Sequence, residues 1–177
     1  MKTLIKNLRR QNADRRYYVP LSAFYHTITY QHVRKILVSA GIEKYHLDET
    51  AKRILADGRK IFAILLLIDQ PALVANFIDE DQLQDHLLPF DEKVLGEISS
   101  NLEIKEFMEK QGEFLTPTFT IGTFTRFTND TAALPFTKDS EIGRGHHSNV
   151  FEIAIDPEHQ VLENPFRQRV SLVVHFS

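Results

Sequence analysis

The most informative stretch of this sequence is Glu141-Ile142-Gly143-Arg144-Gly145-His146-His147-Ser148-Asn149-Val150-Phe151-Glu152-Ile153-Ala154-Ile155. It fits the spacing G-x-G-x-x-[G/S]-x-V, with an apolar residue before the first glycine. Alternating apolar positions follow the loop, which is typical of a β-strand, and glycines between two strands are typical of a tight connection. The stretch therefore predicts strand, glycine-rich loop and strand.

A loop of this kind can bind the phosphates of a nucleotide. Backbone N–H groups have to approach the phosphate oxygens, and side chains at the two glycine positions would block that approach or forbid the turn. The flanking Ile142 and Val150 are expected to pack on the adenine. The predicted nucleotide-binding residues are Ile142, Gly143, Arg144, Gly145, His146, His147, Ser148 and Val150.

Other binding chemistries are disfavoured by the same residues. A Rossmann fingerprint needs a helix directly after its glycines, whereas Val150–Ile155 alternates like a strand, and the Gly-Lys-Ser/Thr of a P-loop is absent. His146 and His147 are interpreted first as exposed residues at the loop tip, with phosphate contact as the alternative. The eight histidines show no H-x₃-H or H-E-x-x-H spacing, so we predict no metal site.

Residues 21–111 are predicted to form a helical bundle. Thr27 or Thr29 can cap a first helix that ends before Gly41. Asp48 can cap a second, longer helix, in which apolar residues keep spacings of three to four. These residues are Ile54, Ile61, Leu65 and Ile68. The segment 61–68 is apolar all round, which is typical of the centre of a bundle, and it is far shorter than the roughly 20 residues that span a bilayer.

Shorter elements are predicted on either side of Gly112. Pro71 ends the long helix, and further helices fit residues 72–77, 91–100 and 102–111. After Gly112 the sequence becomes rich in Thr and Phe, which favours extended structure, with a short strand near residues 134–137. The fold class is therefore predicted as α+β: a helical bundle followed by an incomplete antiparallel β segment.

The charge is distributed unevenly. The chain has 177 residues, a net charge of −3 and no cysteine, so disulfides are excluded. Residues 1–20 carry a charge of +5, and the remaining −8 gathers between Asp79 and Glu113. We interpret residues 1–20 as a basic arm, loose in solution; the alternatives are contact with nucleic acid, with an anionic lipid surface or with the acidic part of the same chain. The sequence has no specific nucleic-acid motif and no secretory signal, which favours an intracellular location, cytoplasmic or nuclear.

The loop stretch resembles the glycine-rich loop of protein kinases, with Ser148 where a third glycine usually stands. The upstream region is similar to a family of filamentous-fungal proteins that have a helical region ahead of a serine/threonine kinase-like domain. The segments that carry this resemblance are Arg59–Leu65, Phe107–Phe119, Leu134–Phe136 and the turn Asp156–His159, with Gly112 where the family pattern has tryptophan. The resemblance implies that residues 112–177 are the start of a kinase domain that binds ATP, with Mg²⁺ if the remaining motifs follow.

Several kinase motifs are missing from this sequence. The third strand of a kinase carries a lysine in a V-A-I-K context, whereas no lysine occurs here after Lys138. Residues 170–175 can imitate that strand without the lysine, and the H-R-D and D-F-G motifs are absent. As written, the chain is therefore expected to transfer no phosphoryl group, because lysine, base and metal ligands supply most of the stabilisation. We predict no catalytic residue.

Two interpretations of the whole chain stay open. The first is the N-terminal part of a protein kinase; Val170-Ser171 then marks either a true truncation or an unspliced intron, because a fungal intron start can translate as Val-Ser. The second is a non-enzymatic helical module that binds a protein partner and keeps the loop as a relic.

Overall fold

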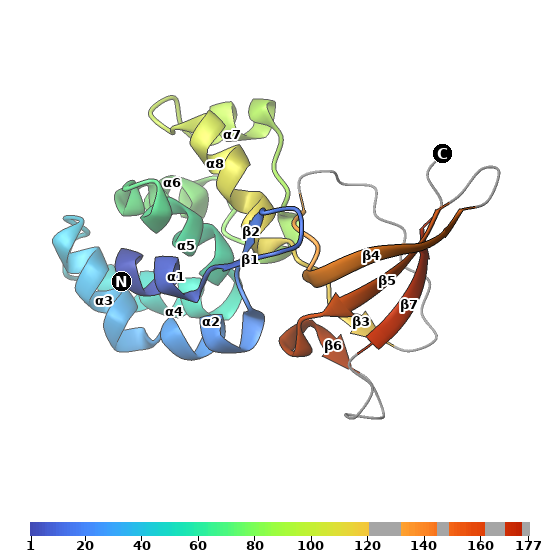
Figure 1. The fold of residues 1–177 in the computed structure, drawn as a ribbon. Coiled ribbons are helices and arrows are strands. Elements are labelled where there is room, and N and C mark those ends of the chain that lie inside the picture. The colour runs from blue at the N-terminus through green and yellow to red at the C-terminus, as the bar shows by residue number, and fades with distance from the viewer. Residues whose placement is uncertain (121–131, 145–148, 162–168, 175–177) are drawn as a thin grey trace.

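The computed structural model describes residues 1–120, 132–144, 149–161 and 169–174, and Figure 1 shows their arrangement. Helices make up the N-terminal part, and small sheets lie toward the C-terminus. The predicted α+β class, with helices first and an antiparallel β segment after them, is confirmed. The division at residues 20 and 111 stays a prediction.

Eight α-helices lie in the described part of the chain. They are α1 Lys2–Leu8, α2 Leu21–Thr27, α3 Tyr30–Ser39, α4 Leu47–Asp57, α5 Arg59–Leu67, α6 Val74–Asp79, α7 Glu92–Ile98 and α8 Ile104–Gln111. Short 3₁₀ turns η1 Pro71–Leu73, η2 Asp85–Leu87, η3 Gly112–Phe114 and η4 Pro157–His159 link other elements. The expected cap of α3 is confirmed: Thr29 Oγ1 accepts the His32 N–H at 3.4 Å, and Gly41 follows the helix with a φ of 83°.

The strands form three small sheets. An N-terminal hairpin pairs β1 Arg10–Gln11 with β2 Tyr17–Tyr18, and β3 Phe119–Thr120 runs parallel to β6 Gln160–Val161. The largest sheet is antiparallel in the order β4-β5-β7, built from Phe136–Arg144, Asn149–Ile155 and Arg169–Val174. The short strand predicted near 134–137 is thus the start of one longer strand, with an irregularity between Phe136 and Lys138.

The prediction of one long helix after Asp48 is wrong, because this segment forms two helices with Gly58 between them. The two helices, α4 and α5, are labelled in Figure 1. His46 precedes α4, and Asp48 lies in its first turn. The start of α5 is capped from elsewhere in the chain: the Asp85 carboxylate accepts the N–H groups of Lys60 at 2.9 Å and Ile61 at 3.1 Å. Periodicity could not show this break, since both helices continue the same apolar spacing.

The helix α5 lies at the centre of the hydrophobic core, as its sequence predicts. Residues 61–65 have no exposed surface, and residues 66–68 are only 6% exposed. The core cluster runs from Ile5 to Phe114, so it belongs to the helical part of the molecule. Phe77, Phe90 and Phe107 pack against one another within it, with ring centroids 5.7 to 6.3 Å apart.

The first 20 residues are not the loose arm that their charge suggested. They form α1 and the β1–β2 hairpin, and Ile5 and Tyr18 are fully buried. Their basic side chains pair with acidic groups of the same chain: Arg9 with Glu113, Arg10 with Asp156 and Glu158, and Lys2 with Asp69. Buried apolar residues order this segment, because burying them outweighs the entropy of a free terminus.

In the described part of the chain, no helix has the length and hydropathy to cross a bilayer.

A matched pair of glycines tests the packing at the break between α4 and α5. A Cβ on Gly58 would lie 2.4 Å from Leu83 Cγ, whereas one on the exposed Gly96 of α7 would meet only Ile104 Cδ1 at 3.8 Å. We expect Gly58→Ala to destabilise the protein by about 1–3 kcal/mol through overpacking. Gly96→Ala should stabilise it by about 0.5–1 kcal/mol, since alanine favours a helix interior. Urea denaturation measures both, and equal effects would contradict the packing.

Candidate functional site

The candidate site is the β4–β5 hairpin that carries the glycine-rich loop. Its strands pair antiparallel up to Gly143 opposite Val150 and Arg144 opposite Asn149. Residues 145–148 connect them and lie outside the described residues. The two predicted strands are therefore found, one on each side of residues 145–148.

An irregularity in the pairing of β4 with β5 lies next to the loop, at one of the predicted residues. The register shifts between Glu141 and Gly143, which leaves Ile142 without a pairing partner across β5. Its side chain is 59% exposed, a large apolar surface beside the first glycine. Bulges commonly redirect a side chain next to a binding site, and an exposed isoleucine here is available to a flat apolar group such as a base.

The predicted nucleotide-binding residues divide into two groups. Ile142, Gly143 and Arg144 end β4, and Val150 lies near the start of β5, so the structure brings these four together at one end of the sheet. Gly145, His146, His147 and Ser148 lie outside the described residues.

The third strand of the sheet is β7, whose Val170–Val174 segment was predicted as an imitation of the third kinase strand. It pairs antiparallel with β5, from Asn149 opposite Val174 to Ala154 opposite Arg169. The strand contains no lysine. Its one cationic residue, Arg169, is the first residue of the strand and lies at the end of the sheet that is farther from the loop. Arg169 is five residues along the strand from Val174, the residue opposite Asn149 beside the loop, which corresponds to about 16 Å.

A buried polar cluster behind this sheet was not predicted from the sequence. Its centre is Asp156, directly after β5, whose side chain is 2% exposed. The carboxylate accepts hydrogen bonds from the Tyr18 hydroxyl at 2.6 Å, from Arg10 Nη1 at 2.6 Å and from the Glu158 N–H at 3.0 Å. The Glu158 carboxylate binds Arg10 Nη2 at 2.6 Å and accepts a hydrogen bond from the Ser22 hydroxyl. The cluster ties the N-terminal hairpin and α2 to the end of β5.

Electrostatics keep this cluster charged. Burial alone would raise the pKa of Asp156, yet the hydrogen bonds from Tyr18 and Arg10 outweigh it and lower that pKa below its ordinary value. The Ser22 hydroxyl and Arg10 likewise lower the pKa of Glu158. Burial and the neighbouring Asp156 raise the pKa of Tyr18, so the phenol stays a donor.

His159 completes the cluster in its neutral form. It is fully buried, and its ring meets that of Tyr18 edge to face with centroids 5.6 Å apart. Nδ1 lies 3.1 Å from the Pro117 carbonyl oxygen, which can only accept, so Nδ1 carries the proton. Nε2 has no hydrogen-bond partner among the residues that the structure describes, and burial lowers the pKa of the imidazole.

The sequence carried one signal for this cluster, the turn Asp156-Pro157-Glu158-His159. An Asp before Pro is typical of a turn, and the Asp156 side chain caps η4 as such a residue should. The partners of this turn, Arg10 and Tyr18 for Asp156 and Ser22 for Glu158, lie more than 130 residues away in the chain. No spacing rule connects residues at such a separation.

The buried Tyr18 hydroxyl can be compared with an exposed one. Tyr30 also donates to an aspartate, Asp48, at 2.8 Å, but on the surface. We expect Tyr18→Phe to cost about 1.5–3 kcal/mol of unfolding free energy, because Asp156 stays buried and charged with one donor fewer. Tyr30→Phe should change little, since water replaces the lost donor. Equal losses in urea denaturation would contradict the importance of the buried cluster.

The lowered pKa of His159 predicts that the stability of the protein depends on pH. Because the folded pKa lies below the unfolded value, the unfolded chain binds more protons near pH 6, and stability falls as pH decreases through the range just below about 6.5. His159→Asn keeps a donor toward Pro117 but cannot titrate, so its stability should change less between pH 7.5 and 5.5. The exposed His86 supplies the control: His86→Asn should retain the wild-type pH profile, and the same flattening in both variants would exclude His159 as the cause.

Comparison of this chain with protein-family models, with curated proteins and with solved structures gives no match, so the site has to be interpreted from its own geometry.

Proposed function

We propose that the β4–β5 hairpin is the ATP-binding glycine-rich loop of a protein kinase N-terminal lobe, and that this chain is the N-terminal part of a serine/threonine kinase-like protein. The observation that supports the proposal most is the hairpin itself, with Gly143 and Val150 opposite each other at the loop end. A third strand antiparallel to β5 supplies the neighbour that such a lobe requires.

The chemistry proposed for the site is binding of the nucleotide. Backbone N–H groups of the loop would contact the phosphates, and the exposed Ile142 would cover one face of the adenine. Strand β7 has no lysine that could hold the α- and β-phosphates. We therefore expect weak binding of MgATP and no phosphoryl transfer by this polypeptide.

A second function is supported by a different observation. The core cluster from Ile5 to Phe114 is built entirely from the helical part and its N-terminal segment. A helical unit with its own core can act as a protein-binding module whether or not the loop binds ATP. The proposed alternative is therefore a helical interaction module, with the hairpin as a relic.

Titration with MgATP by isothermal calorimetry tests the first proposal. Wild type should show saturable binding, and Gly143→Val and Gly145→Val should each weaken it by about tenfold or more, because a branched side chain blocks the approach of the phosphates. Gly96→Ala, a glycine substitution in α7 outside the site, should bind as wild type does. Absence of binding by folded wild type, or binding that both valine variants retain, would contradict the nucleotide site.

A further inference from the structure

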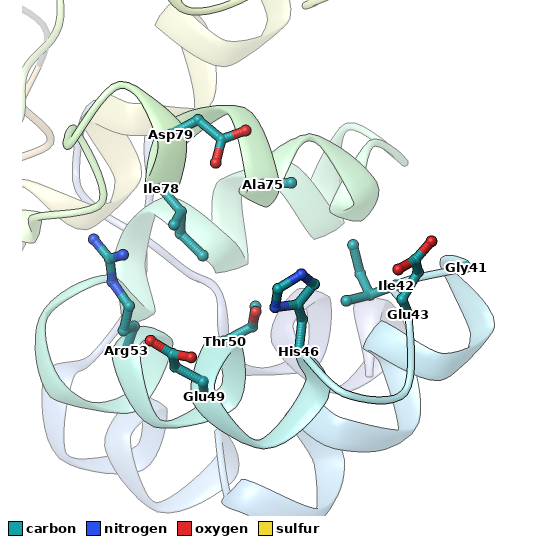
Figure 2. A pocket seen from close by; sticks show the side chains of 10 residues that line it. All are labelled: Gly41, Ile42, Glu43, His46, Glu49, Thr50, Arg53, Ala75, Ile78 and Asp79. Atoms are coloured by element: carbon teal, nitrogen blue, oxygen red, sulfur yellow. The ribbon is translucent and has the colours of Figure 1, made fainter.

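A pocket of about 380 Å³ lies between α4, α6 and the loop that precedes α4, and Figure 2 shows the residues that line it. It belongs to the helical part of the molecule, well separated in sequence from the glycine-rich loop. Pockets that bind small ligands have volumes of roughly 300–1,000 Å³, so this one lies at the lower end of that range.

The floor of the pocket is mostly apolar. Ile42 from the loop and Ala75 and Ile78 from α6 are half-buried and line it. Thr50, from α4, lines the same space between Ile78 and His46 (Figure 2). Thr50 as a residue is only 8% exposed, but its hydroxyl is not one of the fully buried polar atoms without a partner, so the hydroxyl is open to the pocket. A hydroxyl in that position can accept a hydrogen bond from water or from a ligand.

The walls carry three carboxylates, Glu43, Glu49 and Asp79. They come from the loop, from α4 and from α6, and Figure 2 shows them distributed around the apolar floor. Among the residues that the structure describes, none of the three has an ion pair or a side-chain hydrogen bond. The position of Glu49 in the first turn of α4 suits the helix dipole, but that reason does not extend to Glu43 or Asp79.

The basic side chains that line the pocket, Arg53 and His46, do not neutralise the three wall carboxylates. Arg53 pairs with Asp81, outside the pocket, at 3.6 Å. The His46 ring lies against Tyr45 with centroids 4.2 Å apart. Neither forms an ion pair with the three wall carboxylates in the described structure, so the walls offer uncompensated negative charge to a ligand.

We propose that this pocket binds a lysine or arginine side chain from a basic segment of a partner protein. The apolar floor matches the aliphatic stem of such a side chain, the carboxylates match its cationic head, and the Thr50 hydroxyl accepts one of its N–H groups. The inference rests on the interaction-module function. Because the pocket and the glycine-rich loop are probed by different ligands, either proposal can fail alone.

Binding of the peptide Ac-Lys-Lys-Lys-NH₂ to the full chain tests this site, followed by NMR chemical shifts at low salt. We expect saturable binding with shifts at residues 42–53 and 75–79, and weakening of about tenfold in Glu49→Gln/Asp79→Asn. The control Glu97→Gln/Glu106→Gln removes two exposed carboxylates from α7 and α8 and should bind as wild type does. Equal weakening in both double variants would overturn the pocket in favour of unspecific charge attraction.

Two further measurements identify the ligand and the role of Thr50. Thr50→Val should weaken peptide binding several-fold with little change in the stability of the protein, because it removes a hydroxyl that faces the pocket and replaces it with a methyl group of similar size. Unchanged affinity in this variant would overturn the pocket as the binding site. Spermidine carries the same number of positive charges, three, without a peptide backbone, and it should bind more weakly than the peptide. Equal or tighter binding of spermidine would overturn the protein partner in favour of a free polyamine.

Discussion

The buried carboxylate of Asp156 is the constraint on which the joining of the two parts of this molecule depends. An ionised group with 2% exposed surface is stable only if donors replace the water it has lost, and Arg10, Tyr18 and the Glu158 N–H do so. Two of these donors come from the N-terminal hairpin. The carboxylate therefore binds the first residues of the chain to the end of β5, and a backbone hydrogen bond from the Ala13 N–H to the Phe136 carbonyl extends the contact.

Because of this contact, the basic residues of the N-terminus act within the chain. A run of arginines suggests a surface for anions, yet Arg9 and Arg10 are committed to carboxylates of the same chain. Glu113 shows the cost of such pairs: burial raises its pKa although Arg9 lies beside it. Removing one partner of such a pair leaves an uncompensated buried charge, which is costly, whereas the intact pair adds little net stability. These contacts therefore act mainly by fixing how the hairpin packs on the helices.

Much of the helical part could be predicted because its signals are local. The cap at Thr29, the glycine after α3 and the apolar run in α5 each act within a few residues, and each is found as expected. The strand–loop–strand pattern around Gly143 is local in the same way, because alternation and turn residues suffice to indicate a hairpin. The break at Gly58 is different, since Leu83 and Asp85 approach it from a later segment.

By itself, the sequence determined the α+β class, the order of the helices before the largest sheet and the two strands on either side of the glycine-rich stretch, because periodicity and turn chemistry are properties of neighbouring residues. Only the tertiary structure decided that residues 1–20 are folded, that Asp156 and His159 are buried with Tyr18, and that one pocket is lined by three carboxylates without an ion pair to any described residue. Those features join residues that are far apart in the chain. Their energies come from desolvation and from interactions between charges that packing brings together, and neither can be read from the sequence.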